Sequence, residues 1–313
     1  MKTSKWNGTA AKHCPICGSN DIQKWLQAPD RFHARPQLFQ LLRCPSCSLV
    51  WLDNPPSAEE MPYHYGDVYH DVISSIGEAE ILRRWQKQRQ VVSELKSGGA
   101  LLDVGCSSGA FLSTLKNGPW DLYGIEIDAK QASRAREMTG AQIFTGDLFD
   151  APFPAESFDV VTGFHVLEHF DRPQERIQRI FQWLKPGGIL YLGLPNIASW
   201  EARLFGSYWF GLEMPRHLYH YSPSFLRKLI TSAGFHEVWL KTPGTYSGHS
   251  ILYLFDDIVH KIGLTPKLPA VGSAPRPSMN VLLKGYRVAL GTPLAKIAEL
   301  SLAGANIEAV FQK

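Results

Sequence analysis

The chain has 313 residues, of which 44% are apolar and 19% are charged, the composition of an ordinary globular protein of about two domains. This composition excludes a disordered, collagen-like or coiled-coil chain. The formal net charge of +3 is small for a protein whose main ligand is a nucleic-acid backbone. No apolar run approaches the ~18 residues that a membrane span needs, and the N-terminus has no signal-peptide pattern. We therefore expect a cytoplasmic protein, in a compartment where thiols stay reduced.

Four of the five cysteines lie near the N-terminus and form two Cys-x-x-Cys turns. Cys14 and Cys17 make the first turn, and Cys44 and Cys47 make the second, with 26 residues between the turns. Two such turns supply the four thiolates of a structural zinc site, although the separation exceeds the usual ~15–20 residues. We predict a zinc-ribbon-like module over residues 1–60 that binds Zn²⁺ through these cysteines. The alternatives are a chance cluster of free thiols and a redox pair.

Residues 61–97 are predicted to form a linker followed by a first helix. The linker is rich in Pro, Tyr and His, and the helix is expected over residues 77–96. Its tyrosines, Tyr63, Tyr65 and Tyr69, either close over a bound ligand or pack as ordinary linker residues.

From residue 98 onward, predicted strands and helices alternate. Seven apolar runs are predicted strands: Ala100–Val104, Leu122–Ile127, Ala141–Thr145, Phe158–Gly163, Ile189–Leu194, Phe235–Leu240 and Ala305–Phe311. Four helices are predicted between them, over Ala110–Lys116, Ala129–Met138, Pro173–Leu184 and Phe225–Ala233. This alternation predicts an α/β fold with a Rossmann-like, doubly wound and mostly parallel sheet. A helical insertion at about 244–303 interrupts the alternation before the last strand.

The first predicted strand leads into a glycine-containing turn that suits a ligand without a pyrophosphate. Ser107 stands where a dinucleotide-binding turn has its second glycine. Glu126 follows Gly105 by 21 residues, at the end of the next strand, where an acid accepts hydrogen bonds from ribose hydroxyls. Asp147 follows the third strand, where a carboxylate can accept a hydrogen bond from an exocyclic adenine amine.

These motifs resemble those of class I S-adenosylmethionine-dependent methyltransferases over about residues 97–241 and the last strand. The matching segments are Asp103-Val104-Gly105-x-x-x-Gly109, Gly124-Ile125-Glu126-Ile127-Asp128, Gly146-Asp147-Leu148, Phe158-Asp159-Val160-Val161, Leu167-Glu168-His169 and Leu184-Lys185-Pro186-Gly187-Gly188. The resemblance implies a methyltransferase domain over 98–313 that binds S-adenosylmethionine through Asp103, Gly105, Gly109, Glu126, Asp147, Leu148 and His165. Gly105 and Gly109 would pass under the methionine part, Glu126 would bind the ribose, and Asp147 with Leu148 would bind the adenine.

The cysteine turns before such a domain resemble a bacterial subgroup that acts on sugars and other small metabolites. A segment like Pro215–Pro223 occurs in that subgroup before the helix that ends near Gly234. We therefore expect methyl transfer to a small molecule, a sugar or sugar conjugate of a cell-surface polysaccharide or secondary-metabolite pathway. The alternative is an RNA methyltransferase whose zinc module holds RNA, but residues 1–60 carry only seven Lys and Arg against five Asp and Glu. A non-enzymatic interaction module is a third reading, against which the intact cofactor motifs argue.

Methyl transfer to a hydroxyl or a carbon acid needs a base, and histidine has an ordinary pKa near 6.5. We expect His217 to be the base, followed by His220 and then His169. The first two lie in a His- and Tyr-rich segment after the fifth strand, and His169 lies just beyond the fourth. The neighbouring Arg216 is expected to hold an anionic group of the acceptor.

The insertion carries an apolar helical face over Ile251–Ile262. We expect this face to pack on the sheet or against a second copy of the chain in a homodimer. The alternative is contact with a lipid-linked acceptor or a peripheral membrane surface, because Lys284, Arg287 and Lys296 lie nearby in the sequence.

Overall fold

The computed structural model describes residues 13–57, 59–65, 78–244 and 297–313, together with positions 250, 253–254, 257–258 and 261. Backbone contacts divide the chain into two compact units, each assembled from three separate stretches of sequence. Unit 1 consists of Met1–Gly66, Pro195–Leu226 and Lys241–Ile307, and unit 2 of Asp67–Leu194, Arg227–Leu240 and Glu308–Lys313.

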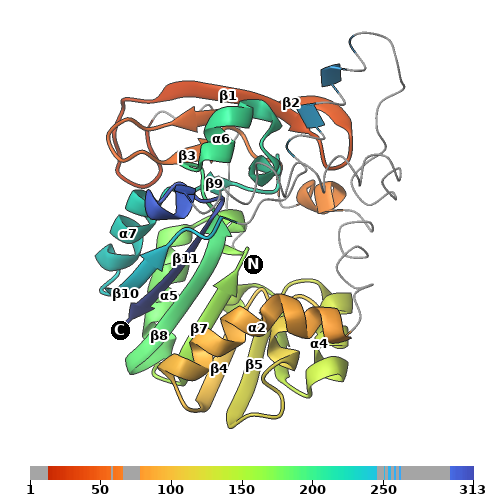
Figure 1. Cartoon of the computed structure of the whole chain (residues 1–313), viewed down its shortest axis with the longest axis vertical. Helices are drawn as coiled ribbons and strands as arrows, with labels where there is room; N and C mark the ends of the chain where they lie inside the picture. The colour runs from red at the N-terminus through yellow and green to blue at the C-terminus, as the bar shows by residue number, and fades with distance from the viewer. Residues whose placement is uncertain are drawn as a thin grey trace. The chain divides into compact units, whose positions relative to one another are not determined.

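Unit 2 is built on a seven-stranded sheet with the order β10-β11-β8-β7-β4-β5-β6 (Figure 1). Its strands are β4 (Gly99–Val104), β5 (Trp120–Glu126), β6 (Gln142–Thr145), β7 (Phe158–Phe164), β8 (Leu184–Pro195), β10 (His236–Lys241) and β11 (Asn306–Gln312). Within this sheet, the five neighbouring strands β8, β7, β4, β5 and β6 pair in parallel. This arrangement confirms the predicted α/β fold with a mostly parallel sheet.

Helices connect these strands, and local sequence signals set their ends. They are α2 (Glu78–Leu95), α3 (Ala110–Ser113), α4 (Ala129–Thr139), α5 (Pro173–Trp183) and α7 (Pro223–Ser232). Asp128 caps α4 by accepting a hydrogen bond from the Gln131 amide, and Gly140 ends it with a φ of 70°. A proline opens α5, where its missing N–H costs nothing. The apolar face of α2 contributes Val92 to the buried cluster that contains Leu101 of β4.

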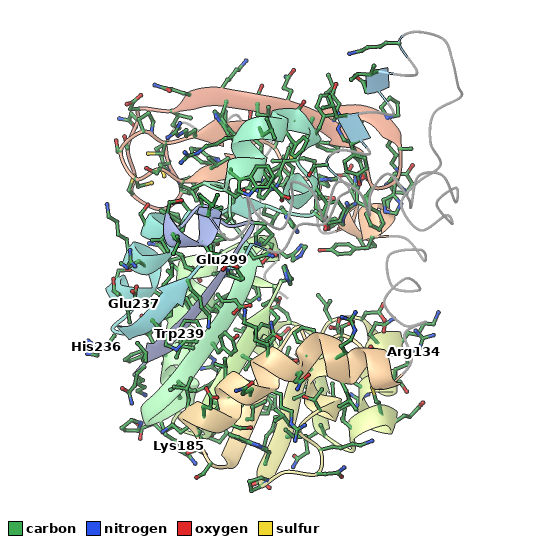
Figure 2. The ribbon with its side chains drawn as sticks, in the orientation of Figure 1. Arg134, Lys185, His236, Glu237, Trp239 and Glu299 are labelled. Atoms are coloured by element: carbon green, nitrogen blue, oxygen red, sulfur yellow. The ribbon has the colours of Figure 1, made fainter. Side chains whose placement is uncertain are left out.

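Strand β8 begins earlier than the sequence pattern predicts. The stretch Lys185-Pro186-Gly187-Gly188 was expected to end a helix, yet it belongs to the strand because the C-terminus pairs with it. The Gly187 amide donates to the Lys313 carbonyl at 3.0 Å, and the Lys313 amide donates to the Gly188 carbonyl at 3.0 Å. Figure 2 marks Lys185 at this end of the sheet, where its Nζ lies 2.7 Å from the Asp159 carboxylate.

Unit 1 contains a second, four-stranded sheet with the order β1-β2-β3-β9. Its strands are β1 (Gln23–Asp30), β2 (Arg35–Arg43), β3 (Val50–Leu52) and β9 (Tyr219–His220), and neighbouring strands are antiparallel. A buried cluster joins this sheet to the segment around α6 (Trp200–Phe205), with Leu41 and Val50 packing in the same core as Phe205 and Trp209. The N-terminal cysteine segment and residues 195–226 therefore form one hydrophobic core.

This interleaved division differs from the linear one expected from the sequence. The domain boundary near residue 60 and the methyltransferase domain over 98–313 stay predictions. The backbone contacts place residues 195–226 in the same compact unit as the N-terminal segment. Most of the predicted insertion at 244–303 lies outside the described residues, and so do Tyr69, Lys284, Arg287 and Lys296. Among the helices that the structure describes, none is long and apolar enough to cross a membrane.

Candidate active site

The loop between β4 and α3 has the backbone conformation that its glycines predict. Gly105, Ser107 and Gly109 have φ values of 71°, 48° and 80°, all in the left-handed region. A Cβ on Gly105 would lie 2.7 Å from Val166, and one on Gly109 would lie 2.9 Å from Thr139. Glycine at both positions therefore lets the loop lie close to its neighbours at the carboxyl edge of the sheet, where ligands bind in open α/β folds.

Glu126 ends β5, and two backbone amides fix its buried carboxylate. Oε2 accepts a hydrogen bond from the Ser107 amide at 2.8 Å, and Oε1 accepts one from the Asp128 amide at 2.9 Å. The unusual φ of Ser107 directs its amide at Glu126. The carboxylate is thus oriented at the loop end, as a group that binds ribose hydroxyls must be.

Asp103 is buried beside this loop, and its carboxyl accepts a hydrogen bond from the Thr162 hydroxyl at 2.7 Å. The pKa of Asp103 is raised to about 7, mainly by burial; the Thr162 hydrogen bond lowers it and the charge of Glu126 raises it. A cation brought next to this carboxyl would favour its ionised form.

Asp147 precedes a short helical turn, η1 (Leu148–Asp150), and caps it by accepting a hydrogen bond from the Phe149 amide at 2.9 Å. Arg176 of α5 also donates to this carboxylate, with Nη1 3.0 Å from Oδ1 and Nη2 2.9 Å from Oδ2. The motifs in the sequence do not point to Arg176. Its signal was a charged residue on the buried face of an amphipathic helix, beside Ile177 and Ile180, which requires a buried partner.

His165 and His169 follow β7, as expected. His165 has a φ of 54° and an exposed side chain, and its backbone amide donates to the Gly193 carbonyl at 2.7 Å. Its Nδ1 lies 3.4 Å from the buried Glu168 carboxylate. His169 is half-buried in the turn η2 (Leu167–His169). The structure brings both histidines and Glu168 to the same edge of the unit 2 sheet as the cofactor loop.

His217 and His220 belong to unit 1, and both side chains are buried. The Nδ1 of His217 lies 2.9 Å from the Gly211 carbonyl oxygen. Because a carbonyl oxygen only accepts, the Nδ1–H donates to it, and Nε2 lies 3.7 Å from the Glu213 carboxylate. Burial lowers the pKa of His220 to about 3, and the two rings lie 6.1 Å apart. His220 therefore stays neutral across the physiological range.

Arg216 is fully buried in unit 1, where its Nη1 lies 3.3 Å from the Asp30 carboxylate and 2.9 Å from the His64 carbonyl oxygen. This placement differs from the expected contact with an anionic acceptor group, because the buried Asp30 already neutralises its charge. Tyr63 of the predicted linker is exposed, and the guanidinium of Arg35 on β2 lies 3.6 Å from the centre of its ring, an ordinary cation–π contact.

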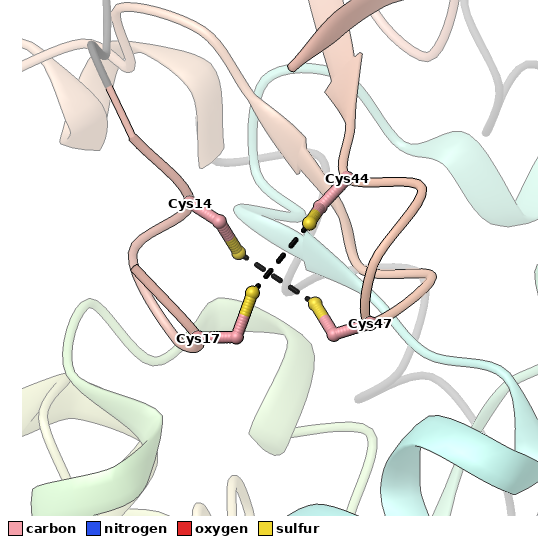
Figure 3. Close-up of side chains that lie close together, drawn as sticks. All are labelled: Cys14, Cys17, Cys44 and Cys47. Atoms are coloured by element: carbon pink, nitrogen blue, oxygen red, sulfur yellow. Dashed lines mark hydrogen bonds between the residues drawn. The ribbon is translucent and has the colours of Figure 1, made fainter. Parts of the chain in front are cut away.

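The four N-terminal cysteines come together in unit 1 (Figure 3). The Sγ atoms of Cys14 and Cys47 are 3.6 Å apart, as are those of Cys17 and Cys44. Thiolates at a typical Zn–S distance of about 2.3 Å form a tetrahedron with edges of about 3.8 Å. The number, chemistry and spacing of these thiols therefore fit a zinc ion.

Comparison with known proteins identifies the family. The model of a family described as "Methyltransferase domain" matches residues 77–239. The "Probable tRNA methyltransferase 9B" of Bos taurus is 29% identical over 132 residues, which cover 41% of this chain and 28% of that protein. A "Probable S-adenosylmethionine-dependent methyltransferase" of Mycolicibacterium smegmatis is 25% identical over 157 residues, covering 49% of this chain and 58% of that protein. The chain therefore spans less than two thirds of the length of these curated relatives.

Solved structures support the same fold. The crystal structure of a SAM-dependent methyltransferase from Archaeoglobus fulgidus covers 74% of this chain and 94% of its own, with a TM-score of 0.51 and 16% identity. This similarity shows the same fold. Because the family model matches more than half of the residues, the chain belongs to the methyltransferase domain family.

Proposed function

We propose that this chain transfers a methyl group from S-adenosylmethionine to a small-molecule acceptor, a sugar or a sugar conjugate, in the cytoplasm. The cofactor supplies the reactive methyl group on its sulfonium. The protein holds the cofactor, orients the acceptor and removes the acceptor proton. The fixed carboxylate of Glu126, with an amide on each oxygen, is the observation that carries cofactor binding.

In this proposal the unit 2 loop holds the methionine part of the cofactor. Gly105 and Gly109 pass under it, and Asp103 and His165 lie at the same end of the sheet. Glu126 accepts the ribose hydroxyls, and Asp147 with Leu148 binds the adenine. Glu126 ends β5 and Asp147 follows β6, and these two parallel strands are neighbours in the sheet. An extended ligand that lies across the carboxyl ends of the strands would therefore contact the two acids one after the other.

The position of the cysteine turns supports a small acceptor over RNA. The second turn leads directly into β3, and β3 pairs with β9, where Val50 lies opposite His220. The cysteine turns thus adjoin the sheet that carries His220. An RNA-holding appendage would instead stand apart with a basic surface, and residues 1–60 carry a net charge of only +2 from seven Lys and Arg and five Asp and Glu.

His217 acts as the general base in this proposal. Its Nδ1–H donates to the Gly211 carbonyl, so Nε2 accepts the proton of an acceptor hydroxyl or carbon acid while the acceptor atom takes the methyl group. S-adenosylhomocysteine leaves as the second product. His169 of unit 2 is the further candidate, whereas His220 on β9, whose pKa burial lowers to about 3, is a weak proton acceptor.

The test measures transfer of labelled methyl from S-adenosylmethionine into two acceptor pools, a small-metabolite extract and total tRNA. We expect label in the small-metabolite pool, with a product 14 daltons heavier than its precursor. His217→Ala should lower the rate by about 10²–10⁴ while the affinity for S-adenosylhomocysteine stays the same.

The exposed His236 on β10, marked in Figure 2, provides the matched control, because its loss should leave the rate unchanged. Label in tRNA alone would overturn the proposed acceptor class. Near-normal transfer by His217→Ala, or a defect confined to cofactor binding, would show that another group is the base.

We also propose one structural Zn²⁺ on Cys14, Cys17, Cys44 and Cys47, since their thiols fit its tetrahedral geometry. Four protein ligands complete the coordination and leave no position for a reacting water. Elemental analysis of the purified chain should find one zinc per chain, and replacing Cys44 and Cys47 by serine should abolish it. A preparation without stoichiometric zinc would contradict the assignment.

A further inference from the structure

We propose that Arg176 is a positioning residue for cofactor recognition: it holds the Asp147 carboxylate so that one oxygen accepts the adenine amine. Arg176 thereby sets the preference of the site for an adenine base. The inference rests on the proposed role of Asp147 in binding the cofactor, and its test separates the two.

The Arg176 guanidinium binds Asp147 end-on, through its two terminal nitrogens. Its Nη1 lies 3.0 Å from Oδ1 and its Nη2 lies 2.9 Å from Oδ2, so two parallel hydrogen bonds join the two planar groups. A bidentate pair of this kind fixes the plane of the carboxylate as well as its position. A lysine at the same place would supply the charge without fixing the plane.

The guanidinium is itself held in place. Nε lies 3.0 Å from Oδ1 of Asp171, and Nη2 lies 2.6 Å from the same oxygen. The rings of Phe149 and Phe170 lie 4.7 Å and 4.9 Å from its central carbon. These contacts keep Arg176 only 9% exposed, which makes it a rigid support for Asp147.

The hydrogen bonds of Asp147 single out the oxygen that faces a ligand. Oδ1 accepts from both the Phe149 amide and Nη1 of Arg176, which use its two lone pairs. Oδ2 accepts from Nη2 of Arg176 and has a second lone pair. The Asp147 side chain is 33% exposed, at the carboxyl end of β6. The exocyclic amine of adenine can therefore donate to Oδ2. A base that carries a carbonyl oxygen in place of this amine would instead set two hydrogen-bond acceptors against each other.

This arrangement is tested by comparing two ligands with the full chain by calorimetry. The ligands are S-adenosylhomocysteine and S-inosylhomocysteine, in which a carbonyl oxygen replaces the adenine amine. We expect the wild type to prefer the adenosyl compound by about 10- to 100-fold, the effect of one hydrogen bond and one mismatched acceptor. In Arg176→Lys and Arg176→Gln the preference should shrink to within about threefold, and Asp147→Asn should do the same.

Arg172→Gln is the matched control. Arg172 lies one turn earlier, 4.3 Å from the Phe149 ring, and its hydrogen bonds go to Asp171 and Glu175. This variant should keep the full adenosyl preference. Asp171→Asn, which weakens the support of Arg176 without touching Asp147, should reduce the preference partly, and it keeps the test open if Arg176→Gln fails to fold.

The outcomes separate the inference from the proposed function. A wild type that binds neither ligand would overturn the proposed cofactor site as a whole. A wild type with no preference would overturn the adenine contact of Asp147 and this inference with it. A wild type with a clear preference that Arg176→Lys retains in full would overturn the role of Arg176 alone.

Discussion

Asp103 combines complete burial with a pKa raised to about 7 by that burial, and this has a consequence for stability. The folded protein binds a proton there at pH values at which an unfolded Asp, with a pKa near 3.9, has lost it. The contribution to stability is present below pH ~4 and is lost as the pH rises through 7. Without cofactor, the free energy of unfolding should fall by on the order of 3 kcal/mol from pH 4 to pH 8 because of this group.

Denaturant unfolding of the wild type and of Asp103→Asn at several pH values checks this expectation. The variant lacks the titrating group, so its curve should miss the part of the slope that Asp103 contributes. The buried Glu201, whose pKa burial also raises to about 7, supplies the same sign of slope in both proteins and therefore cancels in the difference. Parallel curves for the two proteins would contradict the expectation.

Residue spacing indicates some of the candidate site groups and not others, for a physical reason. Gly105 and Glu126 are detectable because a turn and the end of the next strand impose a fixed separation along the chain. Arg176 contacts Asp147 across 29 residues, through a helix whose rotation about its axis decides which side chain reaches the loop. Likewise, Arg216 looked accessible in a polar segment, and only the tertiary structure reveals the buried Asp30 beside it.

The pairing of β3 with β9 links the cysteine turns to the segment that carries the candidate bases. The second turn closes when the Ser48 amide donates to the Cys44 carbonyl at 2.8 Å, and the chain then enters β3. The Leu52 amide donates to the Leu218 carbonyl at 2.9 Å, and Trp51 lies opposite Tyr219. A change in the cysteine cluster therefore reaches the backbone next to His217.

Removing the metal with a chelator, or replacing Cys44 and Cys47 by serine, should loosen this pairing. Hydrogen–deuterium exchange should speed up at residues 49–52 and 218–221, while β4 and β5 keep their protection and the chain keeps its affinity for S-adenosylhomocysteine. Ser46→Ala leaves the four thiols in place, so it should keep the wild-type exchange rates. Unchanged exchange in β3 and β9 after metal removal would show that the cluster does not support the strand pair.

The predictability of each element depended on whether its pattern was local. Strands β4 and β7 are mostly apolar and largely buried runs, which a sequence reveals directly. Strand β9 has only two residues, and its partner Val50 is far away in the sequence, so no periodicity marks it. The early start of β8 escaped prediction because a Pro-Gly-Gly run usually ends an element, and here the C-terminal pairing overrides that signal.

At the scale of the whole molecule, the fold class followed from the alternation of strands and helices, but the division into compact units did not. A composition shift near residue 60 suggests a separable N-terminal module. Phe205, Trp209 and Met214 instead bury their side chains in the same cluster as Phe39 and Leu41. The apolar residues of a connecting segment do not reveal whether they pack in the core of unit 1 or in that of unit 2, because the same pattern of apolar residues suits either core.

Deletion of residues 1–60 should therefore damage the rest of unit 1. We expect the truncated chain to expose the apolar side chains around α6 and to aggregate, whereas a chain that begins at residue 13 and retains all four cysteines should stay monodisperse. Size-exclusion chromatography with light scattering distinguishes these outcomes. A soluble, monodisperse chain without residues 1–60 would show that the N-terminal segment is a removable module after all.

The pairing of β3 with β9 also sets an order of events during synthesis. The chain leaves the ribosome from its N-terminus, and 170 residues separate Val50 from His220. At translation rates of about 5–20 residues per second, β3 waits roughly 10–30 s for its partner strand. If the cysteines bind zinc as we propose, they would close around it during this interval and hold the β1–β3 sheet. We therefore expect a cell short of zinc to make less folded protein.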